Sequence, residues 1–145
     1  MLIISKRFLP LFITQFLGAF NDNMLKNSLV ILITYTIAID SGQNAQVLVT
    51  IAAGLFILPF FIFSALAGQL ADKYNRKTIA KIVKLFEILI MILASLGFIM
   101  GNIWFLIAVL FASGVHSAFF GPIKYALLPQ HLHINELLAG NAYVE

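Results

Sequence analysis

The sequence predicts an all-α integral membrane protein. Of its 145 residues, 61% are hydrophobic and 10% are charged, whereas an ordinary soluble domain has about a quarter of its residues charged. The apolar residues stand in long continuous runs, and about 20 such residues let an α-helix cross a bilayer. Bases gather at the ends of alternate runs. A membrane β-barrel is disfavoured because barrel strands alternate apolar and polar residues.

The apolar runs divide a single, partial membrane domain into four predicted spans and the start of a fifth helix. Neither half of the first run reaches the length needed to span, so we interpret it as one helix of about 48 Å. The short polar breaks predict antiparallel neighbours, with Pro129 ending the fourth span and Asn135 capping the next helix. The predicted ranges are residues 8–39, 45–71, 78–100, 103–128 and 135–145.

A polar stripe runs along the first predicted span. Gln15, Gly18, Asp22 and Lys26 recur at helical spacing and therefore share one face. A central aspartate costs about 2.5–3.5 kcal/mol even on the lenient insertion scale. We therefore expect this face to point into a helix bundle or a water-filled cavity rather than into lipid.

The third and fourth spans carry different signals. The first turns of the third contain Lys81, Lys84 and Glu87, and the two long basic side chains can snorkel to the headgroups. The fourth contains a run of small residues, which predicts a closely packed helix face. That run comprises Ala112, Ser113, Gly114, Ser117, Ala118 and Gly121.

The distribution of bases predicts the orientation. Lys6 and Arg7 precede the first span, and the loop after the second span is strongly basic, whereas the turns after the first and third spans have no base. The positive-inside rule then places the N-terminus and the basic loop in the cytoplasm of a multi-pass membrane protein. The basic residues of that loop are Lys73, Arg76, Lys77, Lys81 and Lys84.

The loop at residues 68–77 resembles the signature of the major facilitator superfamily, G-x-x-x-D-(R/K)-x-G-(R/K)-(R/K), between its second and third helices. The residues that match are Gly68, Asp72, Lys73, Arg76 and Lys77.

One position of this loop departs from the signature. Asn75 stands where the family prefers glycine, and we expect it to adopt the left-handed conformation, which asparagine tolerates. The resemblance implies that the loop acts as a conformational gate by docking against a helix of the second half of the transporter. Alternatively, its bases only set the topology.

Two further regions are similar to the lysophospholipid transporter branch of this superfamily. They are residues 15–23 (QFLGAFNDN), and residues 120–129 (FGPIKYALLP) with residues 136–141 (ELLAGN). Members of the branch stand alone or are fused to an acyltransferase and an acyl-ACP synthetase. The superfamily has twelve helices, so the resemblance implies that this chain is an N-terminal third.

The resemblance implies a secondary, alternating-access transporter that moves lysophospholipid across the cell inner membrane. Its partners would be membrane lipid, the lysophospholipid, a coupling cation, and a missing C-terminal half or fused acyltransferase. Two alternatives stay open: a facilitator of another small amphiphile, and a truncated membrane fragment without transport. The bases flank apolar spans, so we expect no nucleic-acid partner.

Five polar residues are candidates for substrate binding. Asp22 could contact a zwitterionic head group or a coupling cation, or form an ion pair with Lys26, which follows it by one turn. Asn21 and Asn23 could donate to a phosphate or glycerol, or hold neighbouring helices together. Lys26 is interpreted mainly as the charge partner of Asp22. Lys124 could pair with a lipid phosphate or snorkel at a helix end.

No enzymatic or cofactor motif is apparent. There is no nucleophile elbow, phosphate-cradling glycine loop or HxxxxD motif, and the chain has no cysteine. His116 stands alone on the fourth span, where an interhelical hydrogen bond is favoured over a metal site. His131 and His133 lie in a predicted loop and need no role. We therefore expect a non-enzyme without cofactor or metal.

Overall fold

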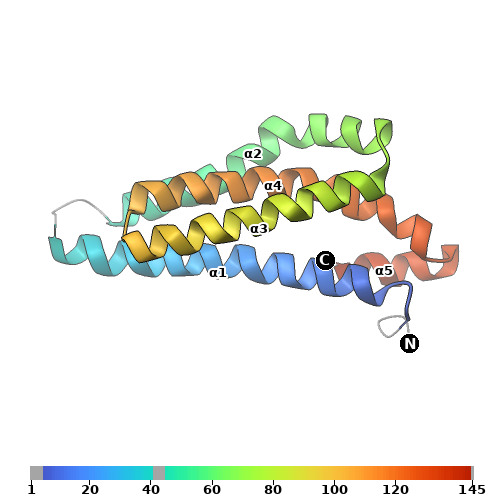
Figure 1. The fold of residues 1–145 in the computed structure, drawn as a ribbon, viewed down its shortest axis with the longest axis horizontal. Coiled ribbons are helices and arrows are strands. Elements are labelled where there is room, and N and C mark those ends of the chain that lie inside the picture. The colour runs from blue at the N-terminus through green and yellow to red at the C-terminus, as the bar shows by residue number, and fades with distance from the viewer. Residues whose placement is uncertain (1–4, 41–44, 145) are drawn as a thin grey trace.

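The computed structural model describes residues 5–40 and 45–144 and forms an elongated helical bundle (Figure 1). The predicted turn after the first span, residue 145 and the side chain of His131 lie outside the described part. The all-α fold class is confirmed for the described residues. The elements are α1 (Leu9–Asp40), α2 (Ala45–Lys73), α3 (Arg76–Met100), α4 (Ile103–His131), the 3-10 helix η2 (Ile134–Glu136) and α5 (Leu137–Val144).

Three helices in the described part, α2, α3 and α4, are long and apolar enough to cross a membrane. At 32 residues α1 is the longest helix, but it is not among them, and it carries Asn21, Asp22, Asn23 and Lys26 within its length. That α1 also crosses the membrane, and that α5 begins a further span, stay predictions.

The closest helix contact joins α2 and α4. An added Cβ at Gly114 would lie 2.4 Å from the carbonyl oxygen of Phe56 and 3.2 Å from Cγ of Pro59. Only a glycine allows the backbones to approach so closely. Ser113, Gly114 and Ala118 are buried, which confirms the predicted packed face of α4.

The apolar core runs along the middle and one end of the bundle. Leu29 and Ile33 of α1 meet Leu106 and Leu110 of α4, with Ala52 of α2 beside them. A separate cluster joins the start of α1 to the end of α4 and to α5, and Figure 1 shows α5 running back alongside the start of α1. Its buried members are Phe8, Leu128, Leu132 and Val144.

A tight turn links α3 to α4. Gly101 has φ +63°, in the left-handed region, and its N–H donates to the carbonyls of Gly97 and Phe98. The next residue, Asn102, caps α4, since its Oδ1 accepts from the N–H of Phe105 at 3.1 Å. The turn thus satisfies backbone groups at both helix ends.

The expected left-handed conformation of Asn75 is wrong. Its φ is −61° and its ψ is 111°, and its Oδ1 accepts from the N–H of Lys77 at 3.0 Å. Asn75 is therefore the N-cap of α3, a position where asparagine is among the favoured residues. Because α2 continues to Lys73 and α3 begins at Arg76, only two residues separate them.

Two predicted helix ends are also wrong. Pro129 lies inside α4, which continues to His131. A proline removes only one backbone donor, and the N–H of Leu132 still donates to the carbonyl of Leu128 at 3.0 Å. Asn135 lies within η2 instead of capping a helix. His133 precedes η2, and its N–H donates to the Glu136 carboxylate at 3.1 Å.

Replacing Gly114 with alanine should destabilise the bundle by about 1–3 kcal/mol, because the new methyl group meets backbone atoms that cannot rotate away. The free energy of unfolding in detergent micelles measures this cost. Gly121→Ala on the same helix is the matched control, since nothing lies within 4 Å of an added Cβ there. Equal stabilities of the two variants would contradict the close α2–α4 contact.

The cap at Asn75 gives a second prediction. Asn75→Ala should lower the free energy of unfolding by about 0.5–2 kcal/mol, whereas Asn75→Gly should lower it by only about 0.3 kcal/mol. The same denaturation measurement compares them. An alanine variant as stable as the wild type would show that the side-chain cap is unimportant.

Candidate functional site

Asp22 of α1 is held by two hydroxyl groups of α4. Ser113 Oγ donates to Oδ1 at 2.6 Å and Ser117 Oγ donates to Oδ2 at 2.5 Å. The two serines are one helical turn apart and therefore face α1 together. Each carboxylate oxygen accepts a hydrogen bond, so the polar face of α1 points into the bundle, as predicted.

The expected ion pair between Asp22 and Lys26 is wrong. Among the described residues, Lys26 forms no ion pair with Asp22, and its Nζ lies 4.5 Å from the centre of the Phe56 ring on α2. A cation over an aromatic face is attracted by the ring quadrupole. Lys26 thus turns to α2, while Asp22 turns to α4.

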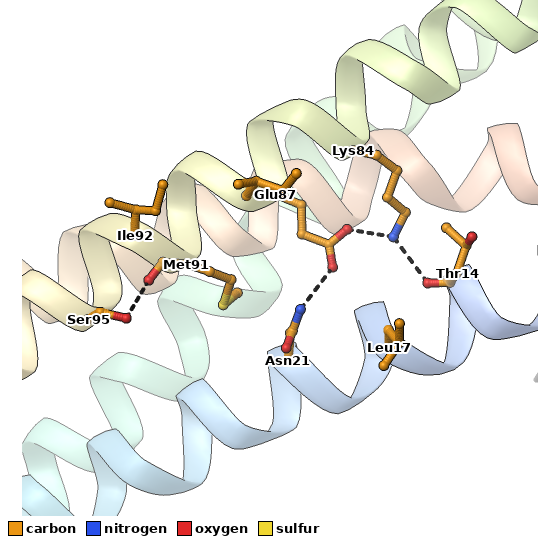
Figure 2. A pocket seen from close by; sticks show the side chains of 9 residues that line it. Thr14, Leu17, Asn21, Lys84, Glu87, Met91, Ile92 and Ser95 are labelled. Atoms are coloured by element: carbon orange, nitrogen blue, oxygen red, sulfur yellow. Dashed lines mark hydrogen bonds and ion pairs between the residues drawn. The ribbon is translucent and has the colours of Figure 1, made fainter.

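A second charged cluster surrounds Glu87 of α3, which is only 7% exposed. Lys84 Nζ lies 2.5 Å from Glu87 Oε2, and the Asn21 amide donates to Oε1 at 3.4 Å. Lys84 also donates to the carbonyl of Thr14 at 3.3 Å. Figure 2 shows Asn21 and Thr14 of α1 facing Glu87 and Lys84 of α3 across a cavity of about 570 Å³.

This arrangement corrects the expected place of Lys84. Its ammonium points into the bundle instead of toward a headgroup, and it also lies 4.3 Å from the centre of the Phe120 ring of α4. Gly18 leaves room for it, since an added Cβ there would lie 2.9 Å from Lys84 Nζ. The buried carboxylate of Glu87 explains the inward turn, because an unpaired charge there would be costly.

His116 of α4 lies beside this cluster. Its Nε2 is 3.6 Å from Glu87 Oε2, and its ring stacks on Phe120 with centroids 6.2 Å apart and an interplanar angle of 8°. Both ring nitrogens are buried, and neither makes a hydrogen bond. The predicted interhelical hydrogen bond is therefore not formed. No group of His, Asp and Glu able to hold a metal occurs among the residues described.

A cavity of about 180 Å³ joins the two clusters. One carboxylate, from Asp22, and two ammonium groups, from Lys84 and Lys124, line it. Lys124 Nζ lies 4.9 Å from the centre of the Tyr125 ring. The wall is completed by small, aromatic and polar groups of α1, α2 and α4: Gln15, Gly18, Ala19, Phe60, His116, Ser117, Phe120 and Gly121.

The structure separates the other predicted substrate residues from this cavity. Asn21 faces Glu87 and lines the larger cavity of Figure 2. Asn23 is exposed, and its amide donates to the carbonyl of Ala19 in its own helix at 2.8 Å. Lys26 is absent from the cavity wall. The predicted set of Asp22, Asn21, Asn23, Lys26 and Lys124 is thus brought together only at Asp22 and Lys124.

The loop residues that match the gate signature occupy the α2–α3 connection. Gly68 lies within α2, while Asp72 and Lys77 are exposed. Arg76 reaches across to α4, where its Nη1 donates to the carbonyl of Ala126 at 3.1 Å. One base of the loop thus fastens it to α4, and its acid faces outward.

Sequence reasoning missed Glu87, Ser113 and Ser117 as polar partners at the site. Ser113 and Ser117 are four residues apart in an apolar span, and this spacing could have been recognised as one polar stripe. Glu87 stands near the start of the predicted third span, where the sequence alone suggests no role for it. Its burial inside the bundle depends on α1 and α4, which no local pattern on α3 reveals.

Comparison with known proteins identifies the family. A family model described as transmembrane secretion effector, of the major facilitator type, matches residues 5–143. No curated protein and no solved structure matches the chain. A family of transporters is consistent with the interpretation of the chain as a multi-pass membrane protein and a non-enzyme. The chain belongs to the transmembrane secretion effector family of the major facilitator superfamily of membrane transporters.

Proposed function

We propose that this chain functions in a secondary transporter, which moves lysophospholipid across the inner membrane by alternating access. The observation that carries the proposal is the set of charges around the cavity of about 180 Å³, which holds the carboxylate of Asp22 and the ammonium groups of Lys84 and Lys124. A phosphoethanolamine head group has the complementary pair of charges. Its ammonium would meet Asp22, and its phosphate would meet the two lysines.

A cavity of this size would take the head group alone. Pockets that enclose a drug-sized ligand measure about 300–1,000 Å³, so this cavity is too small for a whole lipid. The acyl chain would leave past Phe60 and Phe120, which line the cavity on α2 and α4, and continue between the helices. A lysophospholipid has one acyl chain and a diacyl phospholipid has two, so the lysophospholipid needs the narrower exit.

Substrate binding would change the contact between α1 and α4. The ammonium of the head group competes with the hydroxyls of Ser113 and Ser117 for the oxygens of Asp22. A ligand shifts a conformational equilibrium only by binding one state more tightly than the other. Exchange of two interhelical hydrogen bonds for a substrate contact is such a difference, and it would favour one orientation of α1.

The α2–α3 loop would act as the cytoplasmic gate in this scheme. By the positive-inside rule, its bases favour a position for it, with the N-terminus, on the cytoplasmic side. Arg76 is fastened to the carbonyl of Ala126, so the loop and α4 move together. The exposed Asp72 and Lys77 remain for docking against the second half of the transporter. Binding and release of a coupling cation would complete the transport cycle.

A second candidate function is export of another small amphiphile, which the description of the family as secretion effectors favours. Vesicles of defined orientation distinguish the two, since labelled lysophosphatidylethanolamine should move inward under our proposal and outward, or not at all, under the alternative.

Expression of residues 1–145 alone tests the third alternative, a fragment without transport. Robust uptake by that segment would exclude it.

In the complete transporter, Asp22→Asn should abolish uptake of labelled lysophosphatidylethanolamine while leaving membrane insertion intact. The amide keeps the shape of the side chain but removes the charge that the head-group ammonium needs. Uptake by cells, together with the amount of protein in the membrane fraction, measures both effects.

The matched control for this variant is Glu136→Gln, the same exchange of carboxylate for amide. Glu136 accepts from the backbone of His133 in the segment before α5 and does not line the cavity. The control should therefore keep its uptake. Wild-type uptake by Asp22→Asn would remove Asp22 from the mechanism.

A further inference from the structure

We propose that His116 and Glu87 form a proton-binding site, and that proton binding releases Lys84 from Glu87 into the substrate cavity. The inference rests on the assignment of the chain to a transporter and deepens the proposed function. It does not depend on which amphiphile is carried. The ligand is a proton from the aqueous phase, and no bond other than N–H forms.

The unsatisfied ring of His116 is the first support. Both of its nitrogens are buried and lack a hydrogen-bond partner, although a neutral imidazole has one donor and one acceptor to satisfy. Buried polar groups without partners are rare and call for an explanation. Its Nε2 stands 3.6 Å from Glu87 Oε2, only slightly beyond hydrogen-bond distance, so a protonated ring has an acceptor directly before it.

Competition for Glu87 is the second support. Oε2 already holds the ammonium of Lys84 at 2.5 Å and is the oxygen that faces His116. A proton on His116 places a second cation at the same oxygen, and the two like charges repel each other. The imidazolium is confined by stacking on Phe120, whereas the long side chain of Lys84 can rotate away.

The position of Lys84 links the proton to the substrate. Lys84 lines the head-group cavity together with Asp22 and Lys124, so an ammonium that leaves Glu87 remains beside the place of the phosphate. In the unprotonated state Glu87 neutralises Lys84, which weakens its attraction for an anion. Proton binding thus converts a paired lysine into a phosphate ligand, and substrate binding and proton binding favour each other.

The charged groups around His116 come from three helices. Glu87 and Lys84 face it from α3, and Asp22 acts on it from α1. Lys124 of α4 lines the same cavity, and α2 contributes only the Phe60 ring to that wall. Glu87 and Asp22 would attract a protonated His116 ring, and Lys84 would repel it. Displacement of Lys84 from Glu87 removes the closest opposing charge.

The first experiment measures uptake of labelled lysophosphatidylethanolamine by the complete transporter in proteoliposomes at several pH values. Uptake by the wild type should rise as pH falls, by at least about threefold between about pH 8 and pH 5, the range in which histidine changes its charge. His116→Gln should lose this dependence. The control His133→Gln should keep it, because His133 is exposed and contacts Arg7.

The second experiment needs no substrate. Nuclear magnetic resonance of isotope-labelled histidine in the complete transporter reports the proton on each ring, and the signal lost in His116→Gln assigns the residue. The His116 ring should gain a proton in about the same pH range, and Glu87→Gln should weaken that gain. Size-exclusion chromatography checks that each variant is folded.

The outcomes separate the two proposals. The proton site is overturned if lysolipid uptake by the wild type does not depend on pH, or if His116→Gln shows the same pH dependence as the wild type. Either result leaves lysolipid transport standing. Absence of lysolipid uptake at every pH overturns the substrate alone. In that case the resonance experiment decides about the proton site. A His116 ring that gains a proton in the wild type, and gains less in Glu87→Gln, supports the site. A ring that stays neutral, or that gains its proton equally in Glu87→Gln, overturns it.

Discussion

A carboxylate inside a helical bundle is costly unless neighbouring helices supply partners, because burial removes water that would otherwise solvate the charge. This constraint determines how α1 meets the rest of the bundle. Asp22 requires two hydroxyls of α4, and Glu87 of α3 requires Asn21 of α1 and Lys84. Such interhelical contacts are worth about 0.6–2 kcal/mol each, yet their loss would leave a charge buried without compensation.

The helices are joined in two different ways. α2 and α4 meet through close backbone packing at Gly114, where no atom can move aside. α1 meets α3 and α4 near its middle through polar groups at the ends of flexible side chains. Packed surfaces have discrete arrangements, whereas polar contacts can be exchanged for others. The α2–α4 pair is therefore suited to act as a rigid body, and α1 as the element that responds to a ligand.

Much of the fold follows from the sequence because long apolar runs, small-residue faces and turn residues are local signals. The packed face of α4 at Ser113, Gly114 and Ala118 is an example. The partners of charged groups were harder to predict. Lys26 is the near candidate, one turn from Asp22, but the hydroxyls that hold Asp22 are 91 and 95 residues away. Only the assembled helices decide between a near and a distant partner.

The same limit applies to Lys84 and Asn75. The side chain of a lysine near a helix start can extend to a headgroup or into the bundle. Lys84 extends into the bundle because it pairs there with Glu87, which α1 and α4 bury. Asn75 is favoured both in left-handed turns and at helix N-caps. The two-residue connection between α2 and α3 selected the cap.

The turn at Gly101 and Asn102 has a consequence for the charged centre more than a dozen residues away. By ending α3 and starting α4 with defined backbone bonds, it sets the angular phase between the two helices. One residue inserted into α4 between this turn and Ser113 would rotate the following part of the helix by about 100°. His116 would then point away from Glu87, and Ser113 and Ser117 would leave Asp22, with no charged residue altered. The chemistry of the cavity thus depends on the number of residues between the turn and the charged centre.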